Sequence, residues 1–488
     1  MPCTTILVGK KATNNGSTMI ARNDDNGNGH FEIKKFAVIL PDQQPRQYTS
    51  VLSHVQIDLP DNPMRYTAVP NVNPEAKGIW AAAGINAANV AMTATETITT
   101  NPRVQGADPL VEYVPARNGQ PEKAGGIGEE DIVYITLPYI QSARDGVKRL
   151  GMLLEQYGTY ENNGIAFSDH DEVWYMETVG GHHWIARRLP DDCYSVIANE
   201  FSLDLFDLED ATTTQENFMA SADIKEFIEA NHLSTSRTTF NARQAFGSHS
   251  DADHVYNTPR VWFGQRYFNP SDKHMDQLNL RYGPESDSLA WCRKADKLIT
   301  VEDVKYVLSS TYQGTPYSTY SSSPTAKLFR PIGINRTAFC SLAEIRNDVP
   351  EEIAAIEWLA FASNVYNAFV PLYTNIDKVP AYLGDTTLDV NTNSFYWNCR
   401  LLSALGDAQH DTNLIHIERY QDAVEGQTRY VLDEGLREFK EGDNAVEFCN
   451  KQDQIISDIV EKLTAQCLNN VLFEDTCLMR NGYNRSDN

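Results

Sequence analysis

Long apolar runs are scarce in this sequence, which argues against a protein that crosses a membrane. The best candidate stretch, AAIEWLAFASNVYNAFV, is interrupted by Glu357, Ser363 and Asn364. The first residues contain a single apolar cluster over 6–8, which is far shorter than the core of a secretory signal peptide. We therefore expect a cytoplasmic protein with no membrane partner.

Basic residues are few compared with acidic ones, with 41 Lys and Arg against 66 Asp and Glu and a net charge of -25. Phosphate backbones and anionic membrane surfaces are bound by clusters of positive charge. This balance argues against nucleic acid as a partner. With 41% hydrophobic and 22% charged residues, the 488-residue chain has the composition of a globular protein with a large core.

Cysteine never occurs as a C-x-x-C pair in this chain. The eight cysteines are scattered over positions 3, 193, 292, 340, 399, 449, 467 and 477. This distribution is typical of reduced thiols in a cytosol, and it argues against a zinc framework or a disulfide scaffold.

Four common signatures of catalytic and nucleotide-binding sites are also missing. The chain has no GxxxxGK[ST], no GxGxxG after a strand, no HExxH and no GxSxG. AGGIGEE at 124–130 lacks a preceding strand and is typical of a loop. HSDADH at 249–254 and GGHHW at 180–184 carry ligand-type side chains, but such clusters in turn-rich stretches are usually solvated loops. We therefore expect no metal centre and no cofactor.

The first half of the chain is rich in strand-like runs separated by turn residues. TTILVGKKAT and TMIARND flank NNGS and predict a hairpin, and GIWAAAGIN with VAMTATET predicts a second one. Residues 164–188 contain three further runs, broken by SDHD and GGHH. DCYSVIANEF at 192–201 is another candidate strand.

Helical patterns alternate with these strands and dominate the end of the chain. Residues 131–158 have apolar side chains at helical spacing with Gly158 as a stop signal, and 222–232 predicts a short surface helix. At 300–310, a Thr and an Asp three residues later have the spacing of a capping box. From Asn393 onward the pattern is helical. Strands first and helices last predict an α+β protein.

Cys3 lies at the start of the first predicted hairpin, and the return strand carries an arginine followed by two aspartates. The spacing of Cys3 and Arg22 allows two strands and a turn, so the hairpin can bring them together. A neighbouring cation favours the nucleophilic thiolate, and a carboxylate can orient an amine or bind a substrate ammonium. A strand cysteine is more often a buried apolar residue, however, and RNDD is more often a turn. These residues alone leave both interpretations open.

A series of motifs in a fixed order favours the catalytic interpretation. CTTILVGKKAT followed by GSTMIARNDD resembles the start of the C69-type dipeptidases, which belong to the N-terminal nucleophile hydrolases. The resemblance continues, up to about residue 400, in GINAANVAMTATET, GIAFSDHDEVWYMETVGGHHWIARR, VIANEF, PRVWFGQRYF and FVPLYTNI. Choloylglycine hydrolases and penicillin V acylases share the Cys…Arg-Asn-x-Asp opening, so that element alone does not separate the families.

The resemblance implies an αββα sandwich, in which two antiparallel sheets lie between helical layers. It divides the chain into a short propeptide over 1–2, a catalytic domain over 3–390 and a helical C-terminal extension over 391–488. The nucleophile of such enzymes is the first residue of the mature chain.

The resemblance also assigns individual residues of this sequence to a catalytic site. Cys3 corresponds to the nucleophile, and Arg22 and Asp25 correspond to the arginine and aspartate of the opening motif. Asn199 corresponds to the asparagine of the oxyanion hole. Arg260 in PRVW corresponds to a later arginine that flanks the thiol.

Asp24, Thr95 and Glu96 are further expected to bind the substrate. Asp24 and the already named Arg260 are natural partners for the ammonium and the carboxylate of a dipeptide. In choloylglycine hydrolases a second asparagine follows the second hairpin, whereas this chain has Thr95 and Glu96 there. That departure weakens a bile-salt amidase interpretation.

The expected chemistry requires a free amine on Cys3. An α-amine titrates near pH 7.7–8.0, so it can act as a general base for a thiol whose ordinary pKa is about 8.5. Because Pro2 precedes Cys3, we expect self-cleavage or a second peptidase to remove Met1 and Pro2. We expect a cysteine-type dipeptidase that forms a thioester and assembles as a homo-oligomer. The alternatives are a related amidase acting on penicillin V or conjugated bile salts, and a non-catalytic binding protein.

Overall fold

The computed structural model describes residues 3–276 and 282–479, except for the side chains at positions 95 and 96. The expected propeptide therefore lies outside the described residues. No helix among these residues is both long and apolar enough to cross a membrane.

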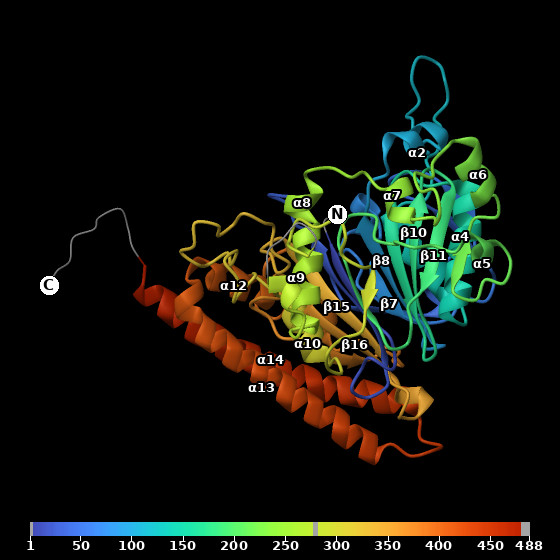
Figure 1. The fold of residues 1–488 in the computed structure, drawn as a ribbon. Coiled ribbons are helices and arrows are strands. Elements are labelled where there is room, and N and C mark those ends of the chain that lie inside the picture. Colours follow the sequence, from blue (N-terminus) through green and yellow to red (C-terminus); the bar gives the residue numbers. More distant parts are fainter. Residues whose placement is uncertain (1–2, 277–281, 480–488) are drawn as a thin grey trace.

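Two stacked sheets form the centre of the molecule (Figure 1). The first has seven strands in the order β14 (Cys292–Arg293), β12 (Tyr194–Ile197), β1 (Thr4–Val8), β2 (Thr18–Asp25), β15 (Thr337–Ile345), β16 (Ala355–Phe361) and β17 (Val370–Tyr373). The second has six, in the order β13 (Phe218–Ala220), β11 (His183–Arg188), β10 (Val173–Val179), β9 (Asn163–Ser168), β8 (Ala91–Thr97) and β7 (Ala83–Ile85). Neighbouring strands in both sheets are antiparallel. Two small two-stranded sheets pair β3 (Ala37–Ile39) with β6 (Tyr66–Ala68) and β4 (Gln47–Thr49) with β5 (Gln56–Asp58).

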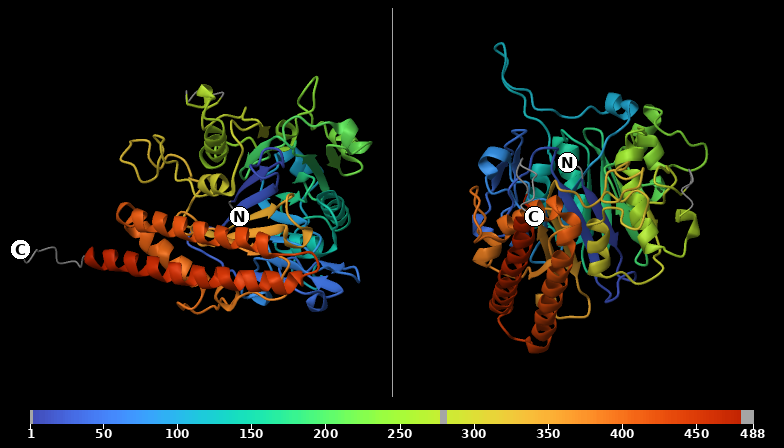
Figure 2. Two further views of the ribbon diagram at one scale, coloured as in Figure 1. Left: turned by 90° about the horizontal axis from the view of Figure 1, so that it is seen from below. Right: turned by 90° about the vertical axis from the view of Figure 1, so that its left-hand side faces the viewer.

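Helices cover the outer face of each large sheet, as Figures 1 and 2 show. On the six-stranded sheet lie α3 (Glu129–Thr136) and α4 (Ala143–Tyr157). On the seven-stranded sheet lie α9 (Thr258–Phe268), α10 (Val301–Leu308), α12 (Phe395–Ala408), α13 (His410–Glu438) and α14 (Ala445–Cys477). The order of layers is helix, sheet, sheet, helix, so the expected αββα sandwich is confirmed.

Short helices fill the connections between these layers. They are α1 (Pro74–Lys77), α2 (Pro102–Ala107), α5 (Leu208–Thr212), α6 (Ile224–Ala230), α7 (Ala242–Phe246), α8 (Asp253–Tyr256) and α11 (Ala381–Gly384).

The alternation of side chains along β1 and β2 determines which residues face the second sheet. Leu7 and Ile20 belong to the apolar cluster between the sheets, whereas Ile6 and Ala21 belong to the cluster under the helices. Since successive strand residues point to opposite faces, Arg22 shares the inner face with Ile20. The predicted hairpin is confirmed, with Thr5 opposite Arg22 in the antiparallel register.

The predicted helix over 131–158 is two helices in the structure. Pro138 interrupts the pattern in a short 3-10 turn, and Ser142 then caps α4 by accepting a hydrogen bond from the amide of Asp145 at 3.1 Å. The stop at Gly158 is confirmed, because this residue follows α4 with a φ of 70°, a value that favours glycine.

Strands β15, β16 and β17 were not predicted, although β15 pairs directly with β2. All nine residues of β15 are buried, so the strand shows none of the polar and apolar alternation that marks a half-exposed strand. The predicted C-terminal helices are confirmed, and α13 and α14 form a long antiparallel hairpin along the sandwich (Figure 2).

Candidate active site

The thiol of Cys3 lies beside a buried guanidinium at the start of β1. The β1–β2 hairpin brings Arg22 back to this end of the strand, where its Nη2 is 2.9 Å from the Cys3 Sγ. Both side chains are fully buried. The cation favours the thiolate form of the cysteine, so the expected pairing of thiol and arginine is present.

Arg22 is held in place by the second sheet. Its Nη1 donates to the carbonyl oxygen of Ala82 at 3.3 Å and also to that of Ala94. Ala82 has a φ of 60°, in the left-handed region that non-glycine residues rarely adopt. Backbone strain of this kind is concentrated at functional sites, where the surrounding structure enforces it.

Two carboxylates complete the inner face of the site. Arg22 Nη2 lies 3.2 Å from Asp24 Oδ1 and 3.6 Å from Glu129 Oε1. One oxygen from each carboxylate and the Cys3 sulfur lie within 4.8 Å of one another. This spacing would suit a metal ion, but the Arg22 guanidinium already occupies the place among the three groups.

Burial determines the charge state of the carboxylate contributed by α3. It raises the pKa of Glu129 from 4.5 to about 7, and the nearby Glu161 and Asp24 carboxylates act in the same direction. The Arg22 guanidinium opposes this shift. Glu129 therefore keeps its proton to a higher pH than an exposed glutamate does.

A second buried cation lies behind Asp24. Lys34 Nζ is 3.5 Å from Asp24 Oδ2 and donates to the carbonyl oxygen of Trp80 at 2.9 Å. Burial lowers the pKa of Lys34, while the Asp24 carboxylate raises it. Asp24 is thus placed between two cations, on the same face of β2 as Arg22.

Asp25 lies on the opposite face of β2 from Arg22 and Asp24. Its Oδ1 accepts a hydrogen bond from Thr337 Oγ1 at 2.6 Å, and its Oδ2 pairs with the Arg330 guanidinium. Asp24 and Asp25 are adjacent in the sequence, but they point to opposite faces of β2 and contact different residues.

Asn199 and Arg260 meet on the other side of the Cys3 backbone. Arg260 Nη2 donates to Asn199 Oδ1 at 2.8 Å and to Asn257 Oδ1 at 2.6 Å. Its Nη1 donates to the Cys3 carbonyl oxygen and to Thr4 Oγ1, the latter at 2.8 Å.

The remaining donor of Arg260, Nε, binds the carbonyl oxygen of Tyr256 at 2.8 Å. An arginine has five N–H donors, and these contacts use all five. Arg260 thus fixes the backbone of Cys3 relative to the side chain of Asn199. Binding of a substrate carboxylate by Arg260 stays a prediction.

Thr95 and Glu96 lie near the end of β8, and their side chains lie outside the described part of the structure. The backbone of β8 is irregular at this point, since its register against β9 shifts between Ala94 and Glu96.

Glu129 and Lys34 were missed in the sequence. AGGIGEE was interpreted as a loop, but its two glutamates begin α3. Three consecutive acids, Glu129, Glu130 and Asp131, open this helix and are all fully buried. Acidic residues immediately before an apolar helical pattern are a helix-start signal that could have extended the predicted helix back to Glu129.

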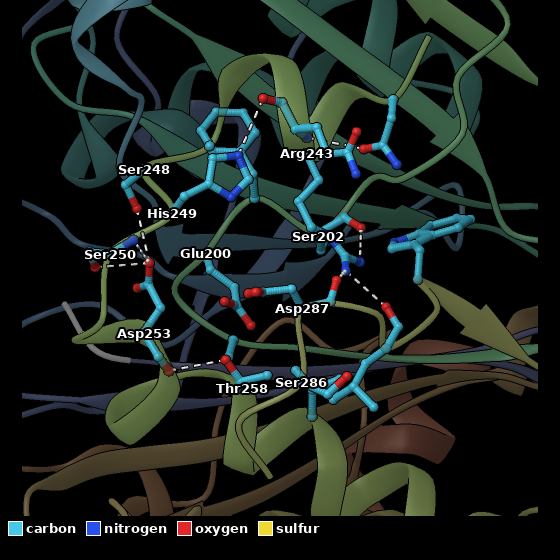
Figure 3. A pocket seen from close by; sticks show the side chains of 18 of the residues that line it. Glu200, Ser202, Arg243, Ser248, His249, Ser250, Asp253, Thr258, Ser286 and Asp287 are labelled. Atoms are coloured by element: carbon cyan, nitrogen blue, oxygen red, sulfur yellow. Dashed lines mark hydrogen bonds between the residues drawn. The ribbon is translucent and has the colours of Figure 1, made fainter. Parts of the chain in front are cut away.

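A cavity of about 460 Å³ adjoins this region on the side of Asn199. Residues on both sides of Asn199 line it, namely Ala198 and Glu200, as do Thr258 and Val261 on both sides of Arg260. Figure 3 shows Glu200 near the middle of the cavity.

The αββα sandwich with a cysteine and an arginine at the start of its first hairpin has the features expected of an N-terminal nucleophile hydrolase. The model of Peptidase family C69 matches residues 2–423. The chain is 53% identical over 428 residues to a dipeptidase of Bifidobacterium longum, an alignment that covers 86% of this chain and 80% of the relative. It is 48% identical over 492 residues to the probable dipeptidase A of Streptococcus pyogenes serotype M3, covering 100% of both chains.

The chain belongs to peptidase family C69 and is a peptide hydrolase. The resemblance seen in the sequence is thereby confirmed. Dipeptidase A of Lactobacillus helveticus is 48% identical over 414 residues, which cover 84% of this chain and 82% of the relative. A solved conjugated bile acid hydrolase from Clostridium perfringens aligns over 76% of this chain and 92% of its own at 10% identity, with a TM-score of only 0.35.

Proposed function

We propose that this protein is a dipeptidase in which Cys3 is the nucleophile. The observation that carries this proposal is the 2.9 Å contact between the Cys3 Sγ and the Arg22 Nη2, in a chain whose relatives are named dipeptidases. The guanidinium stabilises the thiolate that forms when the thiol gives up its proton.

The reaction proceeds through a thioester. The Cys3 sulfur forms a bond to the carbonyl carbon of the dipeptide, and the α-amine of Cys3 takes the thiol proton. The amine then gives this proton to the leaving nitrogen as the peptide bond breaks. The same amine then takes a proton from water as the water oxygen bonds to the thioester carbon. The carbon–sulfur bond breaks to release the acid, and the amine returns the proton to the sulfur.

Asn199 stabilises the negative charge that develops on the carbonyl oxygen. Its Oδ1 accepts from Arg260, which fixes the orientation of the amide and makes Nδ2 its donor side. Loss of one such donor typically costs about 10²–10³ in rate. Arg260 acts as a positioning residue, because it connects Asn199 to the Cys3 backbone.

The base exists only once Met1 and Pro2 have been removed. We propose that the active enzyme begins at Cys3 and that Asp25, fixed by Thr337 and Arg330, orients the new amine. An amide nitrogen at Cys3 could not accept a proton, so the unprocessed chain would lack the base.

Asp24 and Glu129 are suited to bind the α-ammonium of the dipeptide. Both carboxylates lie within 4.8 Å of the sulfur at one oxygen each, so a substrate amine next to the scissile carbonyl would lie within their reach. We propose Thr95 and Glu96, which belong to β8, as further substrate-binding residues.

Hydrolysis of Ala-Ala and Leu-Leu tests the proposal, with the Cys3→Ala variant as its control. We expect the parent to release free amino acids and the variant to be inactive while unfolding at the same temperature. Comparable rates in the two proteins would show that Cys3 is not the nucleophile. Hydrolysis of penicillin V or glycine-conjugated bile salts in place of the dipeptides would assign the chain to the related amidases.

Two features of the protein's setting are also proposed. The free cysteines of the described residues suit a reducing compartment, so we propose that the enzyme acts in the cytoplasm on dipeptides.

We propose in addition that it forms a homo-oligomer, which the molar mass in solution by light scattering would test.

A further inference from the structure

The cavity beside Asn199 is charged on several sides. Its lining includes Glu200 after β12, Asp253 at the start of α8 and Asp287 in the loop before β14. Two guanidinium groups, those of Arg103 and Arg243, also line it. In Figure 3 the Glu200 and Asp287 side chains point toward each other.

Glu200 differs from the other two acids in having its carboxylate uncommitted. Within the described chain no hydrogen bond or ion pair to this carboxylate occurs. Burial raises the pKa of Glu200 from 4.5 to about 7, and Asp253 and Asp287 also raise it, whereas Arg243 and Arg260 lower it. A carboxylate in such surroundings gains from the arrival of a cation.

The other two acids already have partners. Asp253 Oδ2 accepts from Ser248 Oγ and Ser250 Oγ, each at 3.0 Å. Asp287 Oδ1 accepts from His254 Nε2 at 2.9 Å when that ring nitrogen carries its proton. They contribute negative potential to the cavity without being its principal binding group.

Arg243 lowers the pKa of Glu200 through its charge, but the hydrogen bonds of its guanidinium go to backbone carbonyl oxygens rather than to Glu200. Its Nη1 donates to the Leu289 oxygen at 2.8 Å, and its Nη2 donates to the Ser202 oxygen at 2.6 Å. Figure 3 shows these contacts on the wall of the cavity away from Asp253.

The cavity is connected to the reacting centre through short contacts. Asn257 Nδ2 donates to the Asn199 carbonyl oxygen at 3.1 Å and to Asp253 Oδ1 at 2.6 Å. Arg260 joins Asn199 to the Cys3 backbone. Because Ala198 and Glu200 line the cavity, a substrate whose carbonyl oxygen binds Asn199 would lie next to it.

We propose that this cavity receives the basic side chain of a substrate, lysine or arginine, with Glu200 as its counter-charge. The inference rests on the proposed dipeptidase function and assigns that enzyme a preference for dipeptides with a basic residue. The volume of about 460 Å³ suits a whole extended side chain better than an ammonium group alone. The α-ammonium has its own partners in Asp24 and Glu129.

The test compares ligands that differ only in the terminal charge of the side chain. Binding of free lysine and free norleucine to the wild-type protein is measured by calorimetry, and kcat/KM is measured for Lys-Ala and Ala-Lys against Nle-Ala and Ala-Nle. We expect the lysine ligands to be favoured about 10-fold to 100-fold, the range that a hydrogen bond to a charged group supplies. Glu200→Gln should remove this ratio, while the exposed Glu226→Gln on α6 should keep it.

Equal binding of lysine and norleucine, or no binding of lysine, would overturn the inference even if Ala-Ala is hydrolysed. A Glu200→Gln variant that keeps the lysine preference would also overturn it. N-acetyl-Ala-Ala lacks the α-ammonium that Ala-Ala carries. If Glu200→Gln weakened the binding of Ala-Ala but not that of N-acetyl-Ala-Ala, Glu200 would be a partner of the α-ammonium, and the inference would be overturned. Failure of the proposed function appears separately, as absence of hydrolysis of every dipeptide.

Discussion

At the scale of single residues, Arg22 connects the chemistry of the site with its stability. The guanidinium contacts the Cys3 sulfur, two backbone carbonyl oxygens of the second sheet and the carboxylates of Asp24 and Glu129. A buried charge without its partner is costly, so each of these groups depends on the others.

Two replacements of Arg22 distinguish the effect of its positive charge from the effect of its planar set of hydrogen bonds. Arg22→Lys keeps the charge, but an ammonium cannot form the planar set of contacts that the guanidinium makes. We expect kcat/KM for Ala-Ala to fall about 100-fold. Arg22→Ala should lower the free energy of unfolding by about 3–5 kcal/mol, because it strands buried carboxylates. Denaturant titration and steady-state kinetics measure the two effects, and a kcat/KM within threefold of the parent in Arg22→Lys would contradict the account.

Removal of metal ions should leave activity unchanged. The three ligand-type groups at the thiol surround the Arg22 guanidinium, which supplies the positive charge there. Activity on dipeptides after EDTA treatment and gel filtration should equal that of the untreated enzyme. Loss of activity that zinc or cobalt restores would contradict this expectation.

At the scale of elements, α10 is important because it packs against β2, the strand that carries Arg22. Its predicted capping box is present: the Asp303 amide donates to Thr300 Oγ1 at 3.2 Å, and the Thr300 amide donates to Asp303 Oδ2 at 3.1 Å. Asn23 of β2 reaches the end of the same helix, where its Nδ2 donates to the Leu308 oxygen at 2.8 Å.

Thr300→Ala should destabilise the protein by about 1 kcal/mol, the usual cost of losing an N-cap side chain. Thr300→Ser retains the hydroxyl and should remain close to the parent. Chemical denaturation of the three proteins measures this difference. Equal destabilisation by alanine and serine would show that the threonine methyl group matters and the cap does not.

The sequence predicted elements where their local signals were complete. The hairpin with the NNGS turn and the capped helix α10 were predictable because turn and cap residues act locally. β15 was not, because all its residues are buried on both faces and alternation disappears.

In the site, too, residues joined by a local element could be predicted, whereas residues brought together by the packing of layers could not. Cys3 and Arg22 could be paired from hairpin geometry, whereas Glu129 comes from a different layer and reaches the thiol only through the packing of α3 on β8. Acidic side chains are normally exposed, so the sequence did not predict that the three consecutive acids over 129–131 would be buried.

At the scale of the whole molecule, the αββα sandwich buries carboxylates between its layers. Glu357 on β16 accepts hydrogen bonds from Thr67 Oγ1 at 3.0 Å and from Ser341 Oγ at 3.2 Å. Burial raises the pKa of Glu357 from 4.5 to about 7, and these hydrogen bonds oppose the shift.

This burial makes stability depend on pH. Between pH 4.5 and about 7, folded Glu357 keeps a proton that the unfolded chain has released, so the free energy of unfolding falls as pH rises. The loss from this residue is about 3 kcal/mol across that interval. Glu357→Gln should flatten the dependence in denaturation curves from pH 5 to pH 8. A parent and variant with parallel pH profiles would contradict the assignment.

The central claim is that Cys3, freed as the N-terminal residue, is the nucleophile of a dipeptidase. The most direct test is peptide mapping by mass spectrometry of the active enzyme after partial reaction with iodoacetamide. The account predicts a chain that begins at Cys3, with modification of its sulfur proportional to the loss of dipeptide hydrolysis. Full activity in a chain that still begins with Met1, or in one whose Cys3 is completely modified, would contradict it.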